Sequence, residues 1–278
     1  MTTDRTTATK RVPISPLRRT ALVAGVLYLL SFVSIPTLAL YGPVRDLNYI
    51  VGPGPDTPVI FGGVLEIIVA LACIGTAVVL YPVVKRQNEA AALGFVGVRV
   101  LEASTIFLCV VSLLSVVTLR QAGVGADGLL ASQALVAFHD WIFLLGQGFL
   151  PAVNALLLGS LLYQSRLVPR VLPVIGFIGA ALLVVSVAAT LFDLWGQLSA
   201  ASALLTLPIA VWEFSLGVYL IVKGFSPRPS QLPWRLPDDY CRTKFATRQS
   251  FHTLVTTAAR TEMDPVFGKQ ASSNAVSN

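Results

Sequence analysis

The sequence predicts an all-α integral membrane protein: a bundle of six transmembrane helices followed by a disordered C-terminal tail. Of its 278 residues, 55% are hydrophobic and 12% are charged, whereas a soluble domain has about 25% charged residues. The apolar residues form six runs, each with the ~20 residues that a helix needs to cross the ~30 Å hydrocarbon core of a bilayer. The lipid bilayer is therefore the first partner that the composition implies.

The six expected spans cover residues 20–42, 59–84, 93–119, 135–163, 171–194 and 203–222. The first run is longer than the ~7–15 apolar residues of a signal peptide, so we interpret it as a membrane anchor. Pro13 and Pro16 argue against a helix before residue 20, because proline disrupts regular helices. Residues 43–58 and 120–134 are rich in proline or glycine and are expected to be loops.

Basic residues are distributed unevenly among the segments outside the spans. They concentrate in the N-terminal segment, in the second and fourth connectors and in the tail, while the other connectors hold only Arg45 and Arg120. Because basic loops remain in the cytoplasm, both termini are expected there. The expected parts are an N-terminal segment (1–19), a transmembrane domain (20–223) and a tail (224–278), whose low apolar content predicts disorder.

The third span carries two charges inside its apolar run, Arg99 and Glu102. A charge at the bilayer centre costs at least ~2.5–3.5 kcal/mol, so each needs a partner. Residues three apart share one helix face, and the two can pair with each other. Two interpretations follow: an ion pair that only orients the helix, or part of a site for a substrate or proton.

Two other polar residues lie at a similar expected depth, Asn154 in the fourth span and Glu213 in the sixth. We therefore predict that Arg99, Glu102, Asn154 and Glu213 form one binding cluster. With two glutamates for one arginine, one carboxyl is expected to hold a proton. Pro151 leaves a backbone carbonyl of the fourth span without its donor, which favours an irregular helix beside a cavity.

A second acidic group is expected towards the opposite edge of the membrane, made of Glu66, His139, Asp140 and Asp193. Such side chains can bind divalent metals, but their spacing matches no metal motif. The simpler interpretation is a set of polar residues in contact with water. We expect no metal site, no cofactor and no nucleic-acid partner, and the absence of a catalytic motif argues against an enzyme.

Four segments together resemble a known family. They are AGVLYL at 24–29, VRVLEA at 98–103, LLYQSRLVPR at 161–170, and the stretch from Leu207-Pro208 through Glu213 to Gly224. This pattern resembles a bacterial family of multi-pass membrane proteins catalogued as a domain of unknown function (four-three-eight-six), over roughly residues 18–225. The resemblance implies six membrane helices, a place in a bacterial inner membrane, and no established activity. The tail beyond residue 225 departs from the family pattern.

The leading functional expectation is a polar pocket between the third, fourth and sixth spans that binds or passes a small solute, a lipid-like molecule or a proton. Two rivals stay open. The chain could be a structural or accessory membrane subunit whose charges serve packing, or an intramembrane metal-dependent enzyme that uses the second acidic group. The substrate and the oligomeric state are not encoded in any motif.

Overall fold

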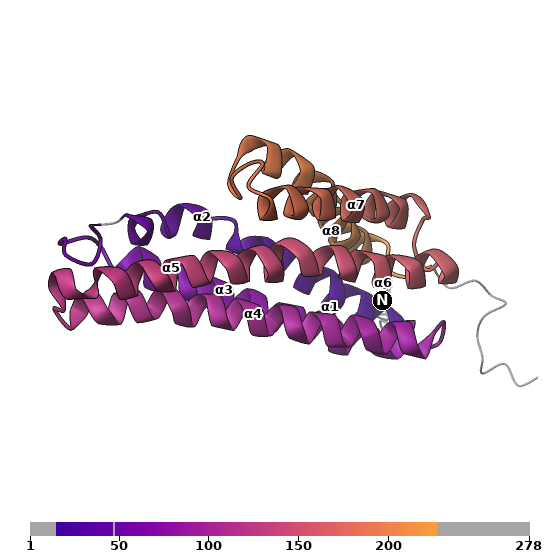
Figure 1. Ribbon diagram of the computed structural model, residues 1–278. Coiled ribbons are helices and arrows are strands. Elements are labelled where there is room, and N and C mark those ends of the chain that lie inside the picture. The colour runs from indigo at the N-terminus through magenta and orange to yellow at the C-terminus, as the bar shows by residue number, and fades with distance from the viewer. Residues whose placement is uncertain (1–14, 47, 227–278) are drawn as a thin grey trace, which may run out of the picture. The chain divides into compact units, whose positions relative to one another are not determined.

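The computed structural model describes residues 15–46 and 48–226, and these ranges contain helices, turns and loops but no strand (Figure 1). Within them, six helical segments are long and apolar enough to cross a membrane, which confirms the all-α fold class with six spans. The N-terminal segment lies largely outside the described ranges. The tail that was expected to be disordered lies almost wholly outside them.

The six spans follow the expected order, and several contain more than one helical element. They are built from α1 (Pro16–Leu30), η1 (Ser31–Ser34) and α2 (Thr37–Leu40); α3 (Thr57–Val84); α4 (Glu89–Gln121); η3 (Gly125–Gly128), α5 (Leu129–Phe143), η4 (Leu144–Phe149) and α6 (Leu150–Ser165); α7 (Val171–Leu191); and α8 (Ala200–Val222). The connector between the first two spans contains a short turn, η2 (Pro43–Arg45). The expected loop at 120–134 is shorter than predicted, because helix resumes at Leu129.

The expectation that Pro16 precedes the first helix was wrong. Pro16 is the first residue of α1, and Ser15 caps the helix by accepting a hydrogen bond from the Arg18 backbone. Proline is favoured at this position because the first helical N–H groups have no intrahelical acceptor. Pro208, in contrast, lies in the interior of α8, which begins eight residues earlier.

Each span packs mainly against the spans before and after it, and α8 closes on α1. The described bundle is thus an up-and-down ring of six spans in chain order, in which neighbours run antiparallel. Glycines allow the closest approaches. A side chain at Gly25 on α1 would collide with the Gly217 carbonyl on α8, and one at Gly176 on α7 would collide with Trp212. Small residues play this role in membranes because helix association there depends on close packing.

Arg18 closes the ring at one end. Its guanidinium donates hydrogen bonds to the carbonyl oxygens of Leu220, Ile221 and Val222 at 3.1, 2.6 and 3.2 Å. The last carbonyls of a helix have no intrahelical donor, so Arg18 caps α8 from the start of α1. The start of the first span and the end of the sixth therefore lie at the same end of the bundle, as an even number of spans requires.

The third and fourth spans are longer than the last two. They have 33 and 41 residues, against 21 and 23 for the fifth and sixth. Figure 1 shows α4 and α5 extending past the ends of α7 and α8. This extension is held by the salt bridge between Arg120 and Asp56, at 2.6 Å, and by a hydrogen bond of 2.7 Å from the Tyr49 hydroxyl to Asp56.

Candidate functional site

Arg99 lies at the centre of the ring and joins two glutamates from different helices. Its Nη1 is 3.1 Å from Glu102 Oε2, one turn along α4, and its Nη2 is 3.3 Å from Glu213 Oε1 on α8. The side chains of Arg99 and Glu102 are 4% and 7% exposed, and that of Glu213 is 17% exposed. Glu213 is therefore the member of this cluster that has the most access to its surroundings.

Asn154 completes the group that the sequence predicted. It is fully buried on α6, and its Nδ2 donates to Glu102 Oε2 at 2.5 Å. Asn154 Oδ1 and Arg99 Nε are buried without a hydrogen-bond partner among the described residues. The structure thus brings Arg99, Glu102, Asn154 and Glu213 together, and we call these four residues the central cluster.

Residues from the first three spans also contact the central cluster. The Arg99 guanidinium lies 5.2 Å from the centre of the Tyr28 ring and 5.9 Å from that of Phe95. Its Nη1 is 3.5 Å from the Cys73 sulfur. An arginine over an aromatic face is stabilised by the electrons of the ring, most strongly where water is excluded. Tyr28 and Phe95 therefore help to hold this cation in an apolar surrounding.

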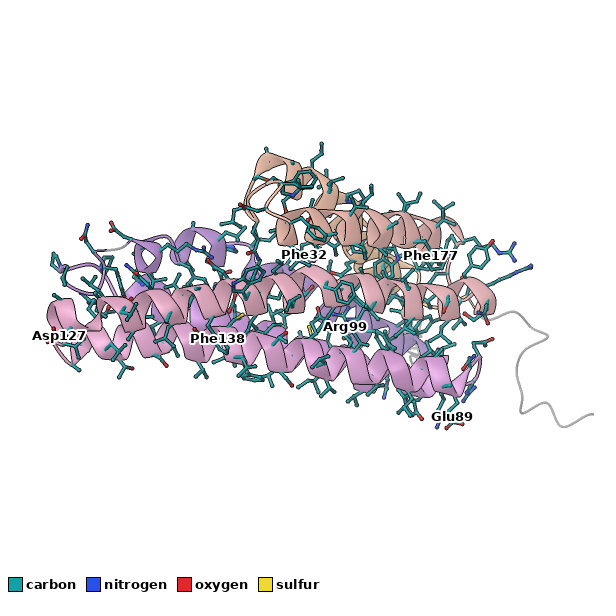
Figure 2. All side chains as sticks on the ribbon, in the orientation of Figure 1. Phe32, Glu89, Arg99, Asp127, Phe138 and Phe177 are labelled. Atoms are coloured by element: carbon teal, nitrogen blue, oxygen red, sulfur yellow. The ribbon has the colours of Figure 1, made fainter. Side chains whose placement is uncertain are left out.

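The central cluster lies well inside the expected membrane spans. Arg99 is about ten residues from the start of α4, which is ~15 Å along the helix axis, and Glu213 is about as far from the end of α8. Both residues therefore fall within a ~30 Å hydrocarbon core. Figure 2 shows Arg99 between the two ends of the long helices, which Glu89 and Asp127 mark. We refer to these ends as the Glu89 end and the Asp127 end.

A cavity of about 230 Å³ adjoins the central cluster. Its polar lining includes Arg99, Glu102 and Glu213 together with Ser31, Ser34, Gln147 and Thr206, and its apolar lining includes Phe32, Ile106, Leu183 and Ile209. This volume is below the ~300–1,000 Å³ of pockets for drug-sized ligands, and it suits a small molecule or several waters. Every span contributes to the lining, not only the third, fourth and sixth.

The fourth span changes its helical form beside this cavity. Residues Leu144–Phe149 form a π-helical turn, and Pro151 follows in the first turn of α6. Gly146 sits so close to Thr105 on α4 that a side chain there would overlap it. π-turns are frequent at functional sites because the wider turn shifts the side chains that follow. Here the turn contains Gln147, which lines the cavity.

The predicted second acidic group is brought together in part. His139 Nδ1 is 3.0 Å from Asp140 Oδ1, and Asp140 forms a two-point salt bridge with Arg45 at 2.7 and 3.0 Å. Glu66, 1% exposed, lines the same small cavity as His139 and Arg45. Asp193 is exposed and does not line it. No set of three His, Cys, Asp or Glu residues in the described part of the chain is placed to hold a metal ion.

Sequence reasoning missed several residues of the site. Ser31 and Ser34 were hidden in the first apolar run, although a pair of serines before Pro36 is a signal for an irregular helix. Each hydroxyl donates to a backbone carbonyl three residues earlier, at 2.6 and 3.0 Å, and such bonds compete with regular helix. The sequence signal for Gln147 is a polar residue that lies between two glycines and shortly before a proline.

A comparison with known sequences places these observations in a family. No curated protein and no solved structure matches the chain. A family model described as "Domain of unknown function (DUF4386)" matches residues 23–224, which include all six spans apart from the start of the first. The chain therefore belongs to this family of membrane-helical proteins.

Proposed function

We propose that this protein binds a small solute with a positively charged or hydrogen-donating group in the cavity beside Glu213, inside a cell membrane. The carrying observation is the surplus of carboxylate: two glutamates meet one arginine at 3.1 and 3.3 Å. A buried charge without a partner is costly, so the surplus favours either a bound proton or a cationic ligand.

Glu213 is the residue that would contact such a solute. Glu102 already accepts hydrogen bonds from both Arg99 and Asn154, whereas Glu213 accepts one, from Arg99. A carboxylate has about four acceptor positions, so Glu213 keeps spare capacity, and it lines the cavity. The apolar walls formed by residues such as Leu183 and Ile209 would take a short hydrocarbon chain.

The experiment is a thermal-unfolding series of the full chain in detergent with four probes of similar size. We expect n-butylamine to raise the melting temperature, because a ligand that binds only the folded state stabilises it. Tetramethylammonium has a positive charge but no hydrogen-bond donor, and butanol has a hydrogen-bond donor but no charge. Butyrate, which is negatively charged, should have no effect. Glu213→Gln should abolish the amine effect, and Glu89→Gln, at the exposed start of α4, should preserve it.

Two results would overturn the proposal: no stabilisation by any amine or alcohol, or stabilisation that persists in Glu213→Gln. The rival role, a structural or accessory subunit, expects the first of these results. That role is favoured by the internal pairing of Arg99 with Glu102, which satisfies part of the charge without any ligand. An effect of butanol alone would favour a neutral, hydrogen-donating solute.

A further inference from the structure

A second buried polar site lies on the Asp127 side of the central cluster. Its cavity, of about 10 Å³, is lined by Glu66, His139, Tyr41 and Arg45 among others. Glu66 and His139 are 1% and 2% exposed. Glu66 Oε2 and His139 Nε2 are both buried without a hydrogen-bond partner among the residues described. Two titratable side chains thus share a space that has room for about one water molecule.

The rim of this site is accessible from outside the bundle. The side chains of Arg45 and Asp140 are 35% and 34% exposed, and they are joined at 2.7 Å. His139 contacts Asp140 through Nδ1, and its other ring nitrogen, Nε2, is buried. A histidine that has one nitrogen towards an exposed carboxylate and the other towards the interior can accept a proton on one side and release it on the other.

Glu66 connects this rim to the interior. It faces the Tyr41 hydroxyl and the Gln147 amide, although neither meets it in good hydrogen-bond geometry. The Cys109 thiol on α4 also lies close to Glu66 and Asp140. Gln147 in turn lines the central cavity, together with Glu102 and Glu213. The π-turn of the fourth span therefore places one amide between two polar cavities.

We propose that Glu66 and His139 form a proton-binding site, and that Gln147 links this site to the central cavity. The Nδ1–H of His139 donates to the Asp140 carboxylate, which leaves Nε2 to accept a proton from water in the small cavity. The imidazolium then releases its Nδ1 proton through Asp140 to bulk water, and the reverse steps carry a proton from bulk water through His139 to the cavity water and the Glu66 carboxylate. From Glu66 the proton reaches water beside Gln147 and then a carboxylate of the central cluster. Each transfer moves one proton, so no oxidant or other reactant is needed.

The chemistry favours a proton over a larger ligand. A space of about 10 Å³ is near the lower limit for a single water, so a solute with several heavy atoms does not fit. The groups that face Glu66 are Tyr41, Gln147, His139 and Cys109, with Asp140 and Arg45 behind them. Arg45 neutralises Asp140, which leaves Glu66 and His139 as the exchanging pair.

The first test uses infrared difference spectra of the full chain in lipid nanodiscs, taken between about pH 5 and pH 8. We expect a carboxylic-acid band that grows as the pH falls and is lost in Glu66→Gln. His139→Gln should shift its midpoint, and Asp193→Asn, an exposed control, should leave it unchanged. A full band in Glu66→Gln would overturn the proposal. If Glu66→Gln does not fold, Glu66→Asp replaces it and must shift the frequency of the band. An unshifted band in Glu66→Asp would also overturn the proposal.

The second test concerns the link through Gln147. Only the role of the central carboxyls, Glu102 and Glu213, rests on the proposed function. The bands lost in Glu102→Gln and Glu213→Gln identify these carboxyls. After transfer to heavy water, exchange of hydrogen for deuterium shifts the frequency of these bands. This exchange should be slower in Gln147→Leu than in the parent chain, and an equal rate would contradict the link. A failure of amine binding would leave both infrared results unaffected, so the two proposals can fail separately.

Discussion

Arg99 on α4 and Glu213 on α8 are 114 positions apart in the chain, and their side chains meet at 3.3 Å in the middle of the bundle. This ion pair links the third span to the sixth across the ring, whereas most other packing joins consecutive spans. Because Arg99 also pairs with Glu102, the two carboxylates compete for one cation. The stability of the bundle and the properties of the cavity therefore depend on the same three residues.

The ion pairs predict strong coupling between mutations. Removal of one partner from a buried pair costs about 3–5 kcal/mol, because the other charge is left without a partner. We expect Arg99→Ala, Glu102→Ala and Glu213→Ala each to lower the free energy of unfolding in detergent. At least one double variant that includes Arg99 should lose less than the sum of its singles. Additivity in both Arg99 doubles would mean that these side chains do not stabilise one another.

The close contact between the π-turn and α4 predicts that alanine substitutions at two glycines will differ sharply in their effect on stability. Gly146→Ala places a Cβ against Thr105, and we expect it to destabilise the protein by about 1–3 kcal/mol, as overpacking does. Gly97→Ala is the control, because nothing lies within 4 Å of its added Cβ. Alanine favours helix over glycine by up to ~1 kcal/mol, so this variant should be neutral or more stable. Equal melting temperatures for the two variants would count against the packing.

The cap that Arg18 forms on α8 predicts different roles for two adjacent arginines. Hydrogen bonds to charged groups contribute about 1.5–3 kcal/mol, and Arg18 donates three to α8. We expect Arg18→Ala to lower the melting temperature clearly. Arg19→Ala removes the same charge from an exposed position and should change little. If both substitutions had the same effect, net charge and not the cap would be responsible.

Asp56, just before α3, predicts a pH dependence of stability. Arg120, with Gln121 and Tyr49, lowers the pKa of this carboxyl from 3.8 to about 2. A group whose pKa is lower in the folded state contributes stability above its unfolded pKa, and this contribution is lost as the pH falls towards the folded value. Near the surface, solvent screening limits the effect to about 1 kcal/mol.

The measurement is the melting temperature of the parent chain and of Asp56→Asn as the pH is lowered. The variant should be less stable than the parent at neutral pH, and the difference should shrink as the pH falls from 3.8 towards about 2. Glu89→Gln, which removes an exposed carboxylate at the other end of the bundle, serves as control. A difference that is constant over this range would show that the Asp56 charge does not contribute.

The distribution of basic residues predicts the orientation in the membrane. Reporter fusions at positions 10, 88, 168 and 230 should lie in the cytoplasm, and those at 50, 125 and 197 should lie outside. The structure requires only that the start of α1 and the end of α8 share one side, because Arg18 joins them. An external reporter at 230 would reverse the assignment of the sides, and reporters at 10 and 230 on opposite sides would contradict six spans.

The sequence by itself determined the membrane class, the six spans and their order. These properties depend on the length and hydropathy of single segments, which a helix in a bilayer must satisfy locally. The pairing of Arg99 with Glu102 was equally accessible, because a separation of three residues fixes their common face. Pro151 indicated an irregular fourth span, although not the π-turn itself.

Only the tertiary structure decided which helix faces meet in the ring. That choice turned the similar expected depth of Glu213 and Arg99 into a contact, brought Tyr28 over the guanidinium, and aligned Arg45 with Asp140. It also separated Asp193 from the group to which the sequence had assigned it. Each outcome depends on the rotation and axial position of one helix against another, set by close packing at residues such as Gly25 and Gly176. In a span that is apolar on all sides, hydropathy does not distinguish the face that meets protein from the face that meets lipid.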